Sequence, residues 1–344
     1  MFKKLHKLFV SLIAIFAIGL TGSMAQAADE DVVEPDVDVD VEVEVDVDVE
    51  PEEPELIPPE VLVPDVDRPL GLNPMVSAEP FGRLNIDMNL HLSDVTDDLT
   101  AFITSPVLQA RIPVGMLGVD NGNALLAGLE IGADLPLLWV APWNDPLDQL
   151  DSAVGVGNPY LSAHFVQALE RTAYSIGLGI AIPLASTDGT RGEARALGYD
   201  YAIGNRIGHD MYLWAPDRLS FVIPARIETI ADRVVLGADV AFAAMLWTGP
   251  GAEDTDYVTQ MGAEIGYRVT PTSTLGLRAL GHWAPTLDEY DFAFALEPGF
   301  RTQLGAGGSF MGIRLTMPIN EPYGFAFDQG NNYALSVSFG TDFR

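Results

Sequence analysis

Charged side chains recur at alternate positions within apolar segments of the chain. Seven arginines and seven carboxylates share one face of these segments: Arg83, Arg111, Arg226, Arg268, Arg278, Arg301 and Arg314, with Asp87, Glu130, Asp134, Glu228, Asp239, Glu264 and Glu297. Equal numbers of opposite charges can form ion pairs between neighbouring strands, or they can line a polar path for a solute. Both interpretations stay open: structural pairs that fix a wall, or residues that line a permeation path.

Nucleophilic catalysis is a second chemistry to consider, because Ser162 and His164 lie two positions apart on one face of a segment. A serine activated by a histidine also needs a group that orients the histidine. No such group can be identified from the spacing, and alternation directs both side chains to the charged face, away from lipid. We therefore expect no enzyme activity, and we place His164 with the residues that face the interior.

The segments expected to be outer loops contain aspartate and glutamate residues but no lysine or arginine. These segments are 93–105, 139–153, 248–255, 286–290 and 320–332. The candidates for binding a divalent cation are Asp94, Asp97, Asp98, Asp145 and Asp148. Carboxylate oxygens are ligands for calcium and magnesium, which lipopolysaccharide phosphates could share. The spacing matches no defined calcium loop, so an ordinary solvated rim is the alternative. The sequence predicts no cofactor.

Twelve segments in which apolar and polar residues alternate must position these groups. They are 81–92, 106–115, 124–138, 154–167, 172–184, 218–230, 233–247, 256–269, 273–285, 291–303, 309–319 and 333–343. Successive side chains of a strand point to opposite faces, so each segment would have an oily face and a polar one. The pattern predicts an all-β protein: a transmembrane antiparallel up-and-down β-barrel of about 12 strands that occupies residues 81–344.

The aromatic residues are sorted by strand parity, which favours the membrane barrel over a soluble β-sandwich. Trp139, Trp247 and Trp283 end odd-numbered segments, at the expected outer interface, and Trp214 falls in an outer loop. A second group is expected at the opposite rim: Phe81, Phe165, Tyr174, Tyr267, Phe300, Phe310 and Phe343. Two aromatic girdles are typical of a barrel that spans a bilayer.

The connections between segments are alternately long and short, as in outer-membrane barrels whose termini both face the periplasm. The longest connection, 185–217, has 33 residues and mixes Arg191, Arg195 and Arg206 with acids, aromatics and glycines. A loop of this length often folds over or into its own pore. A barrel of twelve strands is intermediate between a filled and an open one, so a narrow pore or a plugged lumen is expected.

Two turns fix the expected register of the charged pairs. One tight turn places Glu264 across from Arg278, and a two-residue turn at 305–306 would place Glu297 across from Arg314. A charge that faces lipid costs about 2–4 kcal/mol near the middle of the membrane. We therefore expect these pairs on the inner face.

The first 27 residues have the layout of a secretory signal peptide, with three lysines near the start and an uncharged apolar stretch. Ala25 and Ala27 supply the small residues of a cleavage site. The apolar stretch is shorter than the roughly 20 residues that cross a bilayer. A buried N-terminal helix is the alternative interpretation.

Residues 28–80 are acidic and rich in proline, and they contain an alternation of Asp or Glu with Val from Asp36 to Glu50. Repulsion along such a row of carboxylates opposes strand formation, so we expect a disordered periplasmic segment. The alternative is a tail that binds divalent cations or a basic periplasmic partner.

Composition excludes several classes of partner. The net charge is −31, and the acidic balance argues against nucleic acid, whose phosphates require a basic surface. The chain has no cysteine, which excludes disulfides and thiolate metal sites. One face of the last segment resembles the terminal strand that the bacterial barrel-assembly machinery reads: Tyr333, Leu335, Val337, Phe339 and Phe343. The expected partners are outer-membrane lipid, lipopolysaccharide, this machinery and a small-molecule solute, and the oligomeric state stays open.

Three glycine-rich motifs carry a family resemblance: GVGNPYLSAHF (Gly155 to Phe165), YSIGLGIAIPLAST (Tyr174 to Thr187) and ALEPGFRTQLGAGGSFMGIRLTMPI (Ala295 to Ile319). The chain resembles the outer-membrane proteins grouped as transporters of aromatic (phenol) degradation pathways, which are distantly similar to fatty-acid outer-membrane channels. The resemblance covers most of residues 81–343. It implies a channel for passive uptake of small molecules, hydrophobic or aromatic ones among them. The alternatives are a closed structural or binding barrel that acts through its acidic tail and loops, and a hydrolase embedded in the barrel.

Overall fold

The computed structural model divides the chain into two compact units, Met1–Pro59 and Glu60–Arg344. The described residues all belong to the second unit and are 82–96, 99–117, 128–144, 150–169, 171–206, 208–249, 255–286, 292–305, 308–319 and 333–343. The expected signal peptide and acidic segment, residues 1–27 and 28–80, lie outside the described residues and stay predictions.

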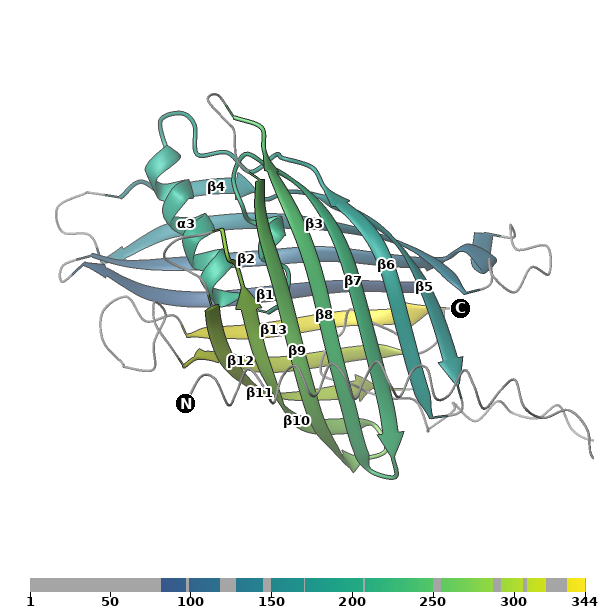
Figure 1. The fold of residues 1–344 in the computed structure, drawn as a ribbon. Helices are drawn as coiled ribbons and strands as arrows, with labels where there is room; N and C mark the ends of the chain where they lie inside the picture. Colours follow the sequence, from purple (N-terminus) through teal and green to yellow (C-terminus); the bar gives the residue numbers. More distant parts are fainter. Residues whose placement is uncertain are drawn as a thin grey trace, which may run out of the picture. The chain divides into compact units, whose positions relative to one another are not determined.

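One antiparallel sheet closes on itself to form a barrel (Figure 1). Its strands are β1 Gly82–Thr96, β2 Leu99–Pro113, β3 Leu129–Asn144, β4 Ala153–Val156, β5 Tyr160–Leu169, β6 Thr172–Ala181, β7 Arg218–Ala231, β8 Val234–Trp247, β9 Thr255–Thr270, β10 Ser273–Trp283, β11 Phe292–Leu304, β12 Ser309–Pro318 and β13 Ala334–Phe343. Closure occurs because β1 pairs with both β2 and β13. The short β4 and β5 both pair with β3 and together form one strand of the wall. The predicted barrel of twelve spanning strands is confirmed.

The outer surface of the barrel is apolar. Leu84 and Ile265 expose 52% and 55% of their surface, while their sequence neighbours on the inner face are buried. Such a band is unfavourable in water and matches the hydrocarbon of a bilayer. Among the described residues, no helix combines the length and the hydropathy needed to cross a membrane.

Several strands extend further than the alternation predicted. β1 continues to Thr96 and β2 starts at Leu99, so most of the expected 93–105 loop is strand and Asp94 lies within β1. β3 likewise continues to Asn144. The alternation was hidden because the inner face of β2 is apolar here, with Ala101 and Ile103 buried inside the barrel.

The described aromatic residues follow the predicted girdles with two exceptions, and Phe81 lies outside the described residues. Trp139, Trp247 and Trp283 are 48%, 37% and 51% exposed on the outer surface. Phe310, expected at the opposite rim, points inward instead, where the Arg301 guanidinium lies 4.2 Å from its ring centroid. Trp214 is fully buried rather than at an outer interface. Both rings therefore belong to the interior packing and not to the membrane interface.

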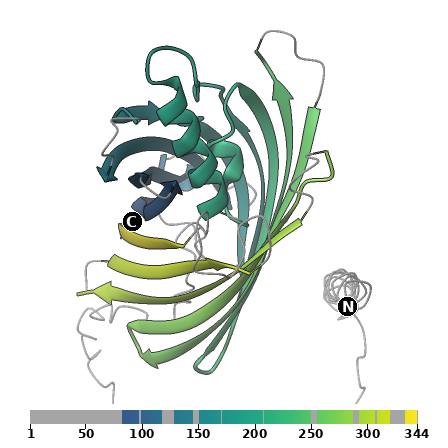
Figure 2. The same ribbon diagram turned by 90° about the vertical axis from the view of Figure 1, so that its left-hand side faces the viewer.

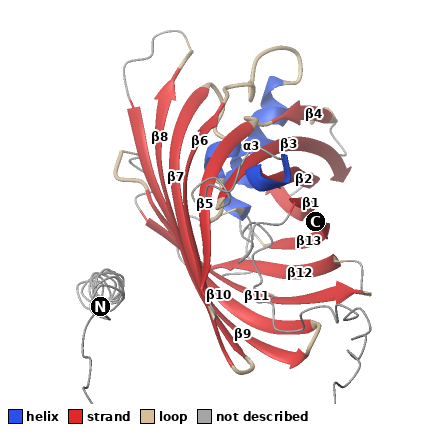
Figure 3. Ribbon diagram, turned by 90° about the vertical axis from the view of Figure 1, so that its right-hand side faces the viewer, coloured by secondary structure: helices blue, strands red, loops and turns tan. Residues whose placement is uncertain are grey.

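The long connection between β6 and β7 folds into the barrel and carries the helix α3 Gly192–Asn205 and the short 3-10 helix η2 Met211–Leu213. A second 3-10 helix, η1 Val114–Leu117, follows β2. Two opposite views show α3 enclosed by the strands (Figures 2 and 3). A Cβ atom at Gly198 would lie 2.5 Å from Val140 Cγ2, so glycine permits the helix to approach the wall of β3. The prediction that this loop folds over or into its pore is confirmed.

Candidate functional site

The inner surface of the barrel is divided along its axis. We call the end at which Gly82 pairs with Phe343 the termini end, and the opposite end the loop end. Near the loop end, apolar side chains pack around α3 and η2: Ala101, Ile103, Val107, Leu138, Val140, Ala153, Val222, Ala243, Met245 and Val258. From mid-height toward the termini end, the inner face carries buried charged residues, all within the set expected to face inward: Arg83, Asp87, Arg111, Glu130, Asp134, Arg226, Glu228, Glu264, Arg278, Glu297, Arg301 and Arg314. His164, Asp239 and Arg268 are partly exposed on this face.

Four residues of the inward-folded connection cross the lumen at the boundary between these halves. We call Arg206, Gly208, His209 and Asp210 the crossbar. Gly208 has a positive φ of 75°, and a Cβ atom there would lie 2.8 Å from Leu280 Cβ, so glycine fits both the backbone turn and the close approach to the wall. The crossbar therefore reaches the wall formed by β10 on one side.

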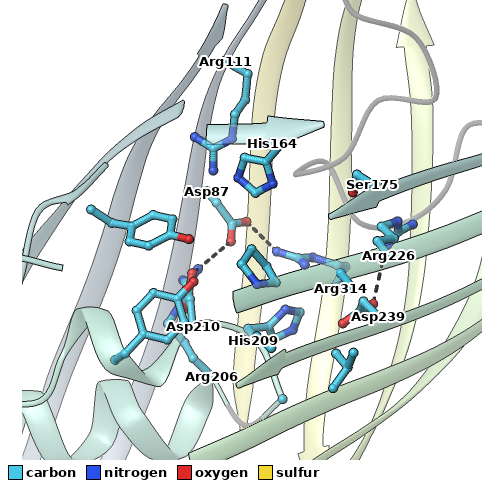
Figure 4. A pocket seen from close by; sticks show the side chains of 17 residues that line it. Asp87, Arg111, His164, Ser175, Arg206, His209, Asp210, Arg226, Asp239 and Arg314 are labelled. Carbon is cyan, nitrogen blue, oxygen red and sulfur yellow. Dashed lines mark hydrogen bonds and ion pairs between the residues drawn. The ribbon is translucent and has the colours of Figure 1, made fainter. Parts of the chain in front are cut away.

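The other side of the crossbar is bound to β1 through Asp87. This carboxylate accepts hydrogen bonds from Arg206 Nη2 at 3.2 Å and from Arg314 Nη2 at 2.6 Å (Figure 4). Arg206 also donates to Asp210 within the crossbar. Burial by itself lowers the pKa of the Arg206 guanidinium, but the charges of Asp210 and Asp87 outweigh it and raise that pKa above its usual value. Arg206 is therefore a permanent cation that bridges the loop and the wall.

Glu297 on β11 is the second point of attachment. His209 Nε2 lies 2.9 Å from one carboxylate oxygen, to which Thr316 also donates at 2.9 Å. The other oxygen accepts from Arg278 Nη1 at 3.3 Å and lies 3.7 Å from Arg314 Nη1. Glu297 is fully buried, so these partners replace the water that a carboxylate would otherwise require.

The register of these pairs agrees with the sequence at one turn and differs at the other. Arg278 lies opposite Glu264, as predicted. On the β10 side, Glu297 lies opposite Arg278. On the β12 side, Glu297 does not lie opposite Arg314, because Arg314 pairs with Gly299. The expected two-residue turn is wrong, since β11 ends at Leu304 and β12 starts at Ser309. The contact between Glu297 and Arg314 is therefore diagonal.

Asp239 on β8 links the charges of the adjacent β7 and of β10, which lies beyond β9. It accepts hydrogen bonds from Arg226 on β7 at 3.3 Å and from Arg278 on β10 at 2.9 Å. Arg226 also donates to Glu228 at 2.5 Å and lies 3.6 Å from Glu264. Arg226 and Arg278 thus each contact several carboxylates, and Asp239 and Glu264 each contact both of these guanidinium groups.

The remaining expected residues form smaller groups nearer the termini end. Arg111 and Asp134 make a bidentate pair with distances of 2.6 and 2.9 Å. Arg83 pairs with Asp342, which the sequence analysis did not single out, and its guanidinium lies 5.5 Å from the Phe310 ring centroid. Glu130 lies opposite His164, and Arg268 donates to the carbonyl of Pro271 in the turn after β9.

Ser162 and His164 share the inner face of β5, as alternation required. Within the described part of the chain, Ser162 Oγ and His164 Nε2 have no hydrogen-bond partner, so no bond joins the two side chains as a catalytic pair. A Cβ atom at Gly177 would lie 2.6 Å from His164 Nδ1, which places the imidazole flat against β6. This packing gives the histidine a role in the wall rather than beside a nucleophile.

The expected cation ligands in the outer loops are not described. Asp97, Asp98, Asp145 and Asp148 lie outside the described residues, and Asp94 is placed in β1 without a described side chain. Elsewhere in the described ranges, no group of three His, Asp or Glu side chains is arranged to hold a metal ion. The cation site stays a prediction.

Asn158 interrupts the wall between β4 and β5 and ties the inward-folded connection to it. Its side chain is fully buried. The amide donates to the carbonyls of Tyr212, Ala215 and Arg218, and its oxygen accepts from the backbone amides of Leu184 and Ala185. The backbone amide of Asn158 also donates to Leu213 at 2.6 Å. The break in the strand is thus an anchor for both ends of the connection.

We predict that Asn158→Ala lowers the free energy of unfolding by about 3 kcal/mol, because it leaves several buried backbone groups without partners. Urea unfolding in lipid vesicles, followed by tryptophan fluorescence, measures the loss. Asn205→Ala is the matched control, since the side-chain oxygen of this buried asparagine has no partner in the described part of the chain. An equal loss in both variants would contradict the anchoring role.

A cavity of about 90 Å³ lies beside the crossbar in the charged part of the lumen. The wall contributes His164 from β5, Ser175 from β6 and Arg226 from β7 (Figure 4). The crossbar contributes Arg206 and His209. The sequence analysis missed the crossbar residues as site residues, although the length of their loop and its mixture of arginines with acids was the available signal.

Comparisons with known proteins find similarity in fold alone. No protein-family model and no curated protein sequence matches the chain. Among solved structures, an outer membrane channel from Pseudomonas putida F1 is 14% identical, with a TM-score of 0.48 over 77% of this chain and 96% of that one. The NanC porin is 8% identical, with a TM-score of 0.41 over 76% and 99%. The β domain of the Bordetella autotransporter BrkA is 9% identical, with a TM-score of 0.40 over 77% and 100%.

Proposed function

We propose that this outer-membrane β-barrel is a passive channel for small molecules whose path is narrowed by the crossbar. The supporting observation is the polar, charge-paired lumen around the crossbar, in which Arg206 and His209 from the loop contact Asp87 and Glu297 of the wall. A barrel that served only as a scaffold could fill its interior with apolar residues, at no cost of desolvating so many charges. Ionic groups in the lumen keep this region compatible with water and polar solutes.

Uptake of aromatic solutes is the finer form of this proposal and rests on the family resemblance of the three glycine-rich motifs. The apolar half of the lumen near the loop end is filled by α3 and η2 in the described part of the chain. Aromatic solutes would therefore have to pass the same polar crossbar as other solutes. Outer-membrane lipid, lipopolysaccharide and the barrel-assembly machinery are the partners that we propose for this barrel.

Recording of single channels in planar bilayers tests the proposal. We expect the purified full chain to give small, discrete conductance steps that persist when residues 28–80 are deleted. Those residues precede β1, so their removal leaves every strand of the barrel in place. Silence before and after the deletion would contradict a channel.

A closed structural barrel is the second candidate. It is favoured by the burial of Arg206, Asp210 and Asp87, whose surfaces are at most 5% exposed. In that case the function would reside in the acidic segment and the outer loops. Solute-driven swelling of liposomes separates the two candidates, because a closed barrel admits no solute.

A further inference from the structure

The cavity beside the crossbar contains more hydrogen-bond donors than acceptors. In the described part of the chain, three guanidinium groups that line it each have one buried N–H without an acceptor: Arg206 Nη1, Arg226 Nε and Arg314 Nε. These arginines are 3–4% exposed. An arginine nitrogen can donate but not accept, so whatever satisfies these groups must bring lone pairs.

The charges of the lining side chains agree with this donor excess. Four arginines line the cavity, and three aspartates oppose them: Arg111, Arg206, Arg226 and Arg314, with Asp87, Asp210 and Asp239. The three carboxylates already accept hydrogen bonds or ion pairs from arginines. His164 Nε2 also lines the cavity without a partner in the described residues, and it donates or accepts according to its tautomer. An additional anion therefore fits the lining better than a cation.

We propose that this cavity is a binding site for small carboxylates. A carboxylate offers about four lone-pair sites and no proton, and guanidinium groups bind it with short, charge-assisted hydrogen bonds. Water also accepts hydrogen bonds, but it carries no charge and its hydrogen bonds to guanidinium groups are weaker than those of a carboxylate. The cavity volume of about 90 Å³ is several times the roughly 10–15 Å³ that one water molecule requires, which leaves room for a carboxylate with one or two further carbons.

The site would make small carboxylates a solute class of the channel, and in that respect it rests on the function proposed above. Two of the donors belong to the wall, Arg226 on β7 and Arg314 on β12, and the third belongs to the crossbar. A bound carboxylate would therefore contact the wall and the inward-folded connection at the same time. This position lies beside the crossbar, in the charged part of the lumen where we propose that the path runs.

The test compares acetate with acetamide, which has the same shape and no charge. We expect saturable line broadening of ¹³C-labelled acetate by the full chain in detergent micelles, and binding of acetamide at least about tenfold weaker. Arg226→Lys and Arg314→Lys keep the positive charge but remove the Nε–H donor, and each is expected to weaken acetate binding about tenfold. Arg233→Lys, in an exposed turn, is the matched control and should leave binding unchanged.

A second variant guards against disturbance of the ion-pair network. Ser175→Leu fills part of the cavity without removing a charge, and it is expected to abolish acetate binding. The proposal is overturned if acetate and acetamide bind equally, if acetate shows no saturation, or if Arg233→Lys loses as much binding as the cavity variants. Acetate binding in a protein that gives no conductance would overturn the channel and leave the binding site standing. Conductance without acetate binding would overturn the binding site and leave the channel standing.

Discussion

Replacement of residues 189–216 by a four-residue glycine–serine linker is expected to raise the single-channel conductance by about fivefold or more. The deletion removes α3, η2 and the whole crossbar, which together fill the lumen from the loop end to its middle. What remains is a wall of twelve spanning strands with a polar inner face at mid-height. The conductance of such a tube is set by the width of the barrel and no longer by the crossbar.

The geometry of the wall permits this replacement. Ala181 near the end of β6 pairs with Ser220 near the start of β7, so the two strands are already neighbours where the connection leaves them. A short linker can therefore join them without altering the register. The apolar inner side chains near the loop end lose their packing partners, and for this reason we also expect a lower unfolding midpoint.

The matched control inserts four glycine and serine residues between Asp232 and Arg233, in an exposed turn far from the lumen. Its conductance is expected to equal that of the original chain. If the shortened chain conducts no better than this control, the crossbar does not limit the path. If the shortened chain fails to assemble, the double variant Arg206→Ala, His209→Ala removes the two ion pairs of the crossbar with Asp87 and Glu297 and is expected to raise conductance about twofold.

The strands of the barrel wall and their inner faces could be predicted from the sequence because one physical constraint determines them. Charged side chains cannot face lipid at tolerable cost, so the positions of Arg226, Glu264 and Arg278 fix which face of each strand points inward. The length of the turn gave the register of Glu264 and Arg278, because the turn between β9 and β10 is tight. Local pattern and turn length determine these features, and both can be read from the residues.

The inward-folded connection could not be predicted in detail because its partners are distant in sequence. Arg206 contacts Asp87, 119 residues away, and His209 contacts Glu297, 88 residues away. No local periodicity encodes such contacts. One indirect signal was present: Ala101 and Ile103 are apolar on the face that should line a lumen, which indicates that something apolar covers that face.

The interruption at Asn158 was missed for a different reason. Residues on both sides alternate between apolar and polar, so one strand over 154–167 was the simpler interpretation, although the outward positions change parity between Val156 and Leu161. The Gly157-Asn158-Pro159 sequence is typical of a turn, yet the adjacent strand positions outweighed it. An asparagine that satisfies backbone groups of another segment has no recognisable pattern within its own strand.

Glu297→Ala is expected to lower the free energy of unfolding by about 3–5 kcal/mol, because it removes one partner of a buried ionic network. The loss leaves Arg278, which is fully buried, and Arg314, which is 4% exposed, with fewer carboxylates to compensate them. It also removes the wall contact of His209. Equilibrium unfolding by urea in lipid vesicles, followed by tryptophan fluorescence, gives the value.

Two further variants separate the charge of Glu297 from its hydrogen bonds. Glu297→Gln keeps an oxygen that can accept from Thr316 at the observed 2.9 Å but loses the negative charge, so we expect roughly half the loss of the alanine variant. Glu193→Ala removes an exposed carboxylate from the first turn of α3 and is expected to cost less than about 1 kcal/mol. If all three variants unfold at the same urea concentration, the buried charges do not hold the crossbar to the wall. In that case its position depends on the apolar packing of α3 and on Asn158.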